Sequence, residues 1–289
     1  MSKYKEVLQM AVSRLLAGGV EEAELDAWFL LTYLTHWNRG EFYLNQELTM
    51  PKMQQIEYEK LLMKRLQHIP LQYILGEQEF MGLTFDVNPS VLIPRQDTEI
   101  LVEEVLKICD QKSILDVCTG SGCIAISLAK LGNNTTVAAV DISNDALEVA
   151  KQNIAKHEVD VTLIHSDMFK AVTKKYDIIV SNPPYIPTSV ISTLMPEVRE
   201  HEPMLALDGT EDGLKFYRIL AEYASKYLNN NGMVFFEIGC EQAKEVCQLL
   251  SENGYYNIKV IKDYAGLDRV VCADYKQPGI EGNDGGKHV

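Results

Sequence analysis

One stretch of the chain reads Tyr176-Asp177-Ile178-Ile179-Val180-Ser181-Asn182-Pro183-Pro184-Tyr185. Its first six residues form a mainly apolar run, which is typical of a parallel strand that is buried on both faces. Two consecutive prolines cannot continue a strand, so Asn182 and the residues after it follow the strand's carboxyl end. Open α/β sheets bind their ligands at the carboxyl ends of the strands. The stretch therefore predicts a parallel sheet with a binding site at this point.

The tetrapeptide Asn182-Pro183-Pro184-Tyr185 carries the groups needed to hold a planar –NH2 group. Asn182 offers an amide oxygen as acceptor, and the carbonyl of the rigid Pro183 offers a second. With both hydrogens held, the nitrogen lone pair can turn toward an electrophile, and Tyr185 offers a flat face for a planar amide or base. The ordinary alternative is a proline-rich turn with a capping asparagine. We favour the functional interpretation, with Asn182, Pro183 and Tyr185 catalytic and the substrate bound by these three and Pro184, because a glycine loop lies upstream.

That loop reads Asp116-Val117-Cys118-Thr119-Gly120-Ser121-Gly122, after a predicted strand at 113–117 and before a predicted helix. A glycine loop in this position lets a nucleotide-like ligand approach backbone amides. Domains that bind NAD, FAD and S-adenosylmethionine share the placement, so the loop alone does not choose among these cofactors. We expect a cofactor to contact five of its residues: Cys118, Thr119, Gly120, Ser121 and Gly122.

Two further strand ends extend the predicted cofactor site. Asp141 follows the second predicted strand, where an acidic residue accepts both ribose hydroxyls of an adenosine cofactor. Its alternative role is to cap the next helix. Asp167 follows the third strand and can accept from an adenine amine, while Met168 and Phe169 can pack on the ring. The alternative for this segment is an ordinary turn with an apolar anchor.

The pattern favours S-adenosylmethionine as the cofactor over NAD or ATP. The loop lacks both the complete G-x-G-x-x-G of dinucleotide sites and the G-x-x-x-x-G-K-[ST] of ATP sites. The strand end at Asn182 also carries the tetrapeptide where a dehydrogenase would need an acid for hydride transfer. We expect Asn182 to contact the methionine part of the cofactor as well as the substrate.

The length of 289 residues fits two domains. Helical periodicity over residues 1–72 predicts a small bundle, and turn residues between apolar stretches predict a β-hairpin linker over 73–94. Strands and helices alternate from 95 to 277, which predicts a doubly wound α/β domain closed by an antiparallel edge. The glycine-rich and charged tail, 278–289, is expected to be disordered.

Several local patterns give sharper expectations. Thr49 stands where a cap is expected for the last helix of the bundle. Within the linker, strands are expected at 80–87 and 91–93. The chain after the tetrapeptide is expected to form a long loop to about Asp212, and residues 229–232 are expected to form a turn.

The formal net charge of −14 argues against duplex nucleic acid as the main partner, because proteins grip phosphates through lysine and arginine. A local basic patch would leave that possibility open, but a basic protein partner fits better. None of the six cysteines forms a CxxC pair or has a histidine at metal-ligand spacing, so we expect no metal and no disulfide. No run is long enough to span a membrane and no signal-peptide core follows the N-terminus, so we expect a cytoplasmic protein.

Taken in register, these motifs resemble the bacterial glutamine methyltransferases that modify peptide-chain release factors, the PrmC/HemK family. The resemblance covers nearly the whole chain and includes two segments around the linker, Pro70-Leu71-Gln72-Tyr73-Ile74-Leu75-Gly76 and Val91-Leu92-Ile93-Pro94-Arg95. The tetrapeptide alone is shared with adenine methyltransferases, so its combination with these segments is the specific signal. Two departures stand out: Cys118 replaces the usual glycine, and Gln96-Asp97 replaces the usual Pro-Glu.

The resemblance implies a Rossmann-like class I methyltransferase domain. It implies methyl transfer from S-adenosylmethionine to the side-chain amide nitrogen of the glutamine in the Gly-Gly-Gln motif of release factors, in support of translation termination. The N-terminal bundle would help to dock the factor. Two alternatives remain. An adenine exocyclic-amine methyltransferase must hold an –NH2 group in the same way, but no basic DNA-binding domain is evident. A catalytically silent binding protein is disfavoured by the intact loop and tetrapeptide.

Overall fold

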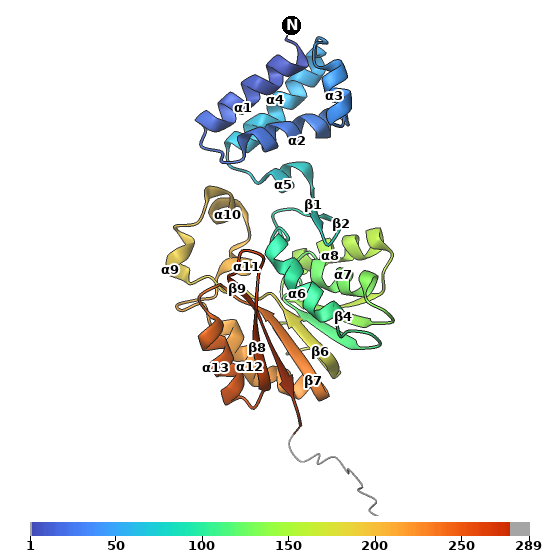
Figure 1. The fold of residues 1–289 in the computed structure, drawn as a ribbon, viewed down its shortest axis with the longest axis vertical. Coiled ribbons are helices and arrows are strands. Elements are labelled where there is room, and N and C mark those ends of the chain that lie inside the picture. Colours follow the sequence, from blue (N-terminus) through green and yellow to red (C-terminus); the bar gives the residue numbers. More distant parts are fainter. Residues whose placement is uncertain (1, 278–289) are drawn as a thin grey trace, which may run out of the picture.

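The computed structural model describes residues 2–277, so the predicted disordered tail at 278–289 lies outside the described residues. Figure 1 shows a small helical part above a larger α/β part, with a short hairpin between them. No helix in the described chain is both long and apolar enough to cross a membrane.

The helical part is built around the apolar faces of four helices, α1 (Tyr4–Ala17), α2 (Ala23–Thr35), α3 (Arg39–Asn45) and α4 (Lys52–Leu66). Leu15, Leu30 and Tyr58 are among the side chains buried at its centre. The predicted cap at Thr49 is wrong, because α4 begins after Pro51 and has no side-chain cap. Thr49 instead forms an isolated antiparallel bridge with Lys3, which ties the loop before α4 to the start of the chain.

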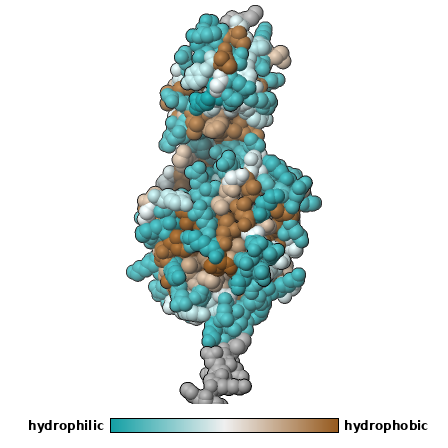
Figure 2. All heavy atoms as spheres, turned by 45° about the vertical axis from the view of Figure 1, so that its right-hand side comes forward, coloured by the Kyte–Doolittle hydropathy of each residue, from teal (hydrophilic) through white to brown (hydrophobic). Residues whose placement is uncertain are grey.

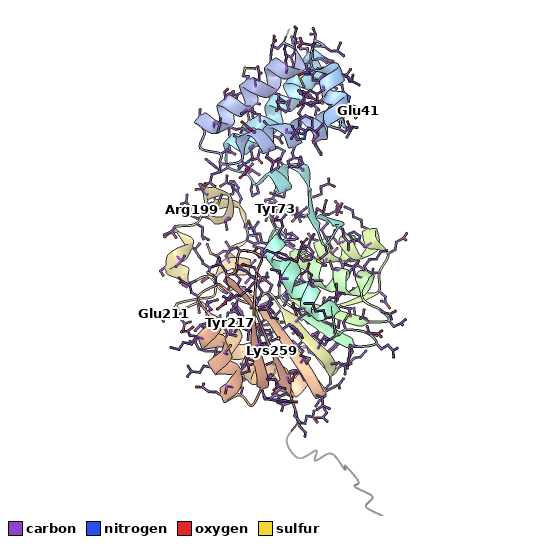
Figure 3. The ribbon with its side chains drawn as sticks, in the orientation of Figure 1. Glu41, Tyr73, Arg199, Glu211, Tyr217 and Lys259 are labelled. Carbon is purple, nitrogen blue, oxygen red and sulfur yellow. The ribbon has the colours of Figure 1, made fainter. Side chains whose placement is uncertain are left out.

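The linker contains a short helix, α5 (Leu71–Leu75), and a hairpin formed by β1 (Glu77–Phe80) and β2 (Leu83–Asp86). The strands predicted at 80–87 and 91–93 are wrong in position. The chain reverses at Met81 and Gly82, which have positive φ angles of 53° and 70°. The first strand was missed because three of its four residues are charged or polar, and only one faces the interior. Figure 3 labels Tyr73 at this junction, where its hydroxyl donates to the Val91 carbonyl at 2.6 Å.

Seven strands form the central sheet in the order β5-β4-β3-β6-β7-β9-β8. The strands from β5 to β7 are parallel, and β9 is antiparallel to both of its neighbours. Their bounds are β3 (Ser113–Val117), β4 (Thr136–Asp141), β5 (Val161–His165), β6 (Tyr176–Ser181), β7 (Leu228–Glu237), β8 (Tyr256–Lys262) and β9 (Asp268–Tyr275). This is the predicted doubly wound fold with an antiparallel edge.

Helices cover both faces of the sheet, which is why the central strands are apolar throughout. Along β6, Ile179 belongs to one buried cluster while Ile178 and Val180 belong to the other. One cluster includes α12 (Lys215–Tyr227) and α13 (Ala243–Glu252); the other includes α6 (Gln96–Leu106) and α7 (Cys123–Leu131), with α8 (Asn144–His157) beside α7. Figure 1 shows the two sets of helices on opposite sides of the strands.

Two predictions after the tetrapeptide are wrong. The expected long loop contains three short helices, α9 (Thr188–Ile191), α10 (Pro196–His201) and α11 (Met204–Leu207), which are too short to show a periodic pattern. The expected turn at 229–232 belongs to β7, which follows α12 directly. Asn229 is held there because its side-chain amide donates to Asp177 Oδ1 at 2.8 Å.

A buried arginine links the helical part to α10. Arg65 is only 6% exposed, and its guanidinium pairs with Asp26 at 2.6 Å and with Glu197 at 2.7 Å. His68 Nδ1 also lies 3.2 Å from Glu197. Because Glu197 belongs to the segment that follows the tetrapeptide, the bundle is connected to the neighbourhood of the predicted site.

Candidate functional site

A cavity of about 290 Å³ lies at the carboxyl ends of β3, β4, β5 and β6. This is the position where parallel α/β sheets bind ligands. The cavity brings together most of the predicted site residues from four separate segments: Cys118, Thr119, Gly120, Ser121, Asp141, Asp167, Met168, Asn182 and Pro184. Gly122, Pro183 and Tyr185 do not line it.

The glycine loop after β3 bends sharply beside this cavity. Cys118, Gly120 and Gly122 all have positive φ angles, of 65°, 56° and 81°. A Cβ atom added to Gly120 would meet no atom within 4 Å, so this residue borders open space. A Cβ on Gly122 would lie 3.0 Å from Ile126 and 3.2 Å from Ala150, so Gly122 allows close helix packing instead.

Cys118 occupies a left-handed backbone conformation that costs a non-glycine residue roughly 1–2 kcal/mol. Glycine is favoured at such a position because it has no Cβ. The thiol of Cys118 lies 3.9 Å from Met168 Sδ, and burial raises the pKa of this thiol above its ordinary value. The cysteine is therefore a neutral packing group in a strained position.

Asp141 presents both carboxylate oxygens to backbone amides at the cavity wall. Oδ2 accepts from Gly120 N and Oδ1 from Ser143 N, each at 2.9 Å. The alternative role as a helix cap is wrong, because Ser143 caps α8 by accepting from Ala146 N at 3.2 Å. Burial raises the pKa of Asp141, while the amides of Ser143 and Gly120 favour its ionised form. A carboxylate oxygen has two lone-pair directions, so each can accept a further hydroxyl.

Asp116 lies fully buried beneath the glycine loop. Its Oδ2 accepts from the Thr119 hydroxyl at 2.6 Å, whereas Oδ1 has no partner among the described residues. Burial raises the pKa of Asp116 to about 7. The sequence analysis included Asp116 in the glycine-loop motif without giving it a role. Its burial beneath the loop and its bond to Thr119 indicate that it supports the loop.

The segment after β5 differs in part from the prediction that it contacts adenine. Asp167 and Met168 line the cavity, and Asp167 also pairs with Lys170 at 2.6 Å. The role predicted for Phe169 is wrong, because its ring is buried outside the cavity and stacks on Tyr227 with centroids 5.0 Å apart. Ile142 and Phe216 are among the apolar lining residues that the sequence analysis did not identify. An apolar residue directly after Asp141 was the available sequence signal for the first of them.

Asn182 lies at the opposite wall and is held by a residue from α6. Its Nδ2 donates to Thr98 Oγ1 at 3.2 Å, which leaves Oδ1 as the acceptor of the side chain. Arg95 and Thr98 also line the cavity, so part of the charged segment at 95–99 borders the site. Arg95 pairs with the buried Glu202, while Asp97 faces outward and pairs with Arg269 at 3.0 Å.

Tyr185 is fixed through its backbone. Gln242 Nε2 donates to the carbonyls of Tyr185 at 3.0 Å and Gly213 at 3.3 Å, and its Oε1 accepts from Gly239 N at 3.0 Å. A Cβ on Gly213 would lie 2.3 Å from the Tyr185 carbonyl oxygen, so only glycine fits there. The sequence did not identify Gln242, because its contact with Tyr185 joins residues 57 positions apart.

The part of the chain that the structure describes contains no group of three or more histidine, cysteine or acidic side chains placed to hold a metal. The six cysteines are all free.

The larger part of the molecule has the fold of a methyltransferase. The family model described as the methyltransferase small domain matches residues 95–197. A solved methyltransferase from Pyrococcus furiosus is similar in fold, with a TM-score of 0.53 and 21% identity over 68% of this chain and 91% of its own.

The helical part and the full-length relatives define the family more closely. The PrmC N-terminal domain model matches residues 6–76. The release factor glutamine methyltransferase of Geobacter sulfurreducens is 42% identical over 92% of this chain and 95% of its own. The release factor glutamine methyltransferase of Clostridium botulinum is 39% identical over 93% of this chain and 98% of its own. The chain belongs to the family of release factor glutamine methyltransferases.

Proposed function

We propose that this protein transfers a methyl group from S-adenosylmethionine to the side-chain amide nitrogen of the glutamine in the Gly-Gly-Gln motif of peptide chain release factors. The observation that carries the proposal is the hydrogen bond from Asn182 Nδ2 to Thr98, which presents Oδ1 as a fixed acceptor beside the cavity that contains Asp141. Family membership supports the same acceptor, since the relatives are named for release factor glutamine methylation.

The cavity walls suit S-adenosylmethionine. Asp141 has free lone pairs for two ribose hydroxyls, and Gly120 borders open space where a ligand can approach the backbone. Asp167, which lines the cavity, would accept from the adenine amine, and Met168, Ile142 and Phe216 would provide apolar surface for the adenine ring. When bound, this cofactor supplies a methyl group on a positively charged sulfur, which is a strong electrophile.

The acceptor side of the site must orient a weak nucleophile. An amide nitrogen shares its lone pair with the carbonyl, so positioning is the main contribution that the protein can make. We propose that Asn182 Oδ1 accepts one amide hydrogen and the Pro183 carbonyl oxygen accepts the other. Pro184, whose ring nitrogen belongs to that same peptide group, lines the cavity. Tyr185 would pack on the amide plane, in the position that Gln242 fixes.

Apolar residues at the mouth would exclude water from the reacting groups. Leu205 lines the cavity and is 54% exposed, and Pro203 and Ala206 lie beside it in the lining. Figure 2 shows apolar surface, in brown, between the two parts of the molecule and on the larger part below. A partner that covers these groups would close the site over its own glutamine.

The helical part would dock the release factor. Glu197 connects the bundle to the segment between α9 and α11, which borders the mouth of the cavity. A factor seated on the bundle would therefore lie close to Asn182. The net charge of −14 also favours a partner with basic surface over nucleic acid.

The proposal is tested by incubating the protein with labelled S-adenosylmethionine and either an unmodified release factor or duplex DNA. Label is expected on the factor alone, and mass spectrometry of its Gly-Gly-Gln peptide is expected to show one methyl group on the glutamine. A factor in which this glutamine is replaced by alanine is the control and is expected to remain unlabelled. Label on DNA, or on neither substrate, would contradict the proposal.

A further inference from the structure

Glu237 is a buried carboxylate that the mechanism above does not use. It ends β7, next to the strand that carries the tetrapeptide, and it is only 2% exposed. Ser181 pairs with Phe236, so Asn182 and Glu237 follow at the same end of neighbouring strands. Glu237 does not line the cavity, and its Oε2 has no hydrogen-bond partner among the described residues.

We propose that Glu237 is a positioning residue that fixes the orientation of the Asn182 side-chain amide through the Thr98 hydroxyl. This inference rests on the proposed function, because it assigns a task to a residue behind the glutamine site.

The direction of the hydrogen bonds supports the inference. A threonine hydroxyl has one proton to donate. Because Thr98 Oγ1 accepts from Asn182 Nδ2 at 3.2 Å, its proton remains available for another acceptor. An ionised carboxylate can only accept, and Thr98 is the side chain that most favours the ionised form of Glu237. In the proposed relay, Asn182 donates to Thr98 and Thr98 donates to Glu237, which leaves Asn182 Oδ1 for the substrate.

Loss of the negative charge would reverse this order. A protonated or amidated Glu237 can donate to Thr98, which would then donate its own proton to Asn182 Oδ1. The amide of Asn182 would turn and present its –NH2 group to the substrate –NH2 group. Two donors facing each other cannot bond, so the glutamine would lose its fixed acceptor.

The surroundings of Glu237 keep its ionisation sensitive to pH. Arg269 from β9 and Arg95 beside α6 favour the charged form, and Asp97 opposes it. Tyr185 and Tyr217 also face this carboxylate, and Tyr217, labelled in Figure 3, donates its hydroxyl to the Glu237 backbone carbonyl at 2.7 Å. Burial outweighs the favourable groups and raises the pKa of Glu237 to about 7. The charged form that orders the relay therefore gains population as the pH rises through about 7.

The test compares Glu237→Gln and Thr98→Val with wild type, using methylation of a release factor and calorimetric binding of S-adenosylmethionine. Each variant is expected to lower kcat roughly 100-fold, the range for losing one preorganised hydrogen-bond partner, with cofactor Kd little changed. The double variant is expected to lose no more activity than either single variant, because both substitutions interrupt the same chain of hydrogen bonds. Thr98→Ser keeps the hydroxyl and is expected to retain most of the activity.

The pH profile separates positioning from a structural role. Wild-type kcat is expected to rise with pH through about 7, and Glu237→Gln is expected to lose this dependence. The folded-state pKa of Glu237 is raised, so its ionisation costs stability as pH rises from about 4.5 through 7, and Glu237→Gln should melt no lower than wild type at pH 8. Asp177→Asn, at the opposite end of β6, is the matched control and is expected to keep the wild-type profile.

An active wild type with unchanged kcat and pH profile in Glu237→Gln would overturn this inference alone. Weaker cofactor binding together with a lower melting temperature in Glu237→Gln would also overturn it, because the residue would then be structural. A wild type that does not methylate the factor would overturn the proposed function, and this inference with it.

Discussion

The two walls of the cavity are held in place by different means. On the cofactor wall, Asp141 is tied to backbone amides of Gly120 and Ser143, one of them only two residues away. On the acceptor wall, Asn182 is held by a side chain 84 residues distant, and the backbone of Tyr185, which follows in the tetrapeptide but does not line the cavity, is held by one 57 residues distant. The cofactor wall is therefore largely a property of strand ends and tight loops, whereas the acceptor wall depends on the packing of α6, β7 and the start of α13.

This difference has a consequence for function. Backbone amides can bind a common cofactor through hydrogen bonds that do not depend on particular side chains. An amide acceptor has to be placed accurately, because a small displacement of reacting groups lowers the rate strongly. Substitutions in the two walls should therefore separate cofactor affinity from turnover.

The largest effect is expected for Asn182→Ala on the acceptor wall. This variant removes the acceptor of one substrate hydrogen, so kcat for release factor methylation should fall by roughly 100- to 1000-fold. Binding of S-adenosylmethionine, measured by calorimetry, should largely remain. Full activity in Asn182→Ala would show that the acceptor wall does not hold the substrate amide.

The next effect is expected for Asp141→Ala on the cofactor wall. Loss of two hydrogen bonds to a charged acceptor should weaken cofactor binding by about 3 kcal/mol, or roughly 100-fold in Kd. At saturating cofactor, kcat should change far less than in Asn182→Ala. The exposed Asp145, at the start of α8, provides the matched control Asp145→Ala, which should leave Kd unchanged. Equal Kd values for Asp141→Ala and wild type would refute the ribose contact.

A smaller effect on turnover is expected for Gln242→Leu behind Tyr185. The substitution leaves the Tyr185 and Gly213 carbonyls without their donor, so the tetrapeptide loses part of its support. We expect kcat to fall about 10-fold, equivalent to about 1.4 kcal/mol, with cofactor Kd within a factor of two. Gln248→Leu on the exposed side of the same helix is the control. A loss of cofactor affinity that matches the loss of kcat would show that the two walls are coupled.

The smallest effect is expected at Cys118, and it concerns stability. Cys118→Gly relieves the positive φ angle of 65°, while Cys118→Ala keeps a Cβ and removes only the thiol. The free energy of unfolding from denaturant titrations should be about 1 kcal/mol higher for the glycine variant than for the alanine variant, because only alanine retains the left-handed strain. Equal stabilities of the glycine and alanine variants would mean that the glycine loop relaxes around a side chain at position 118. The cofactor Kd of the two variants would then show whether this relaxation has displaced the cofactor wall.

Much of the cofactor wall was predictable because its signals are local. The strands predicted at 113–117 and 176–181 match the structure in their bounds, since each is an apolar run that ends at turn residues. The hairpin was misplaced because Glu77 to Glu79 show no apolar alternation, and β7 was shortened because three asparagines resemble a turn. Phe169 was misassigned because an aromatic residue after a strand can face either the ligand or the core.

The alternation of strands and helices in the α/β part, the glycine loop, the tetrapeptide and the resemblance to one family could all be recognised from the sequence alone. These features depend on residues that are close together in the chain, where period and turn chemistry act directly. The assembled fold brings Thr98 to Asn182, Gln242 to the Tyr185 carbonyl, and Glu237 to the strand end beside Asn182, and the sequence indicated none of these contacts. Such contacts join different elements, and burial and hydrogen-bond direction exist only once the sheet has assembled.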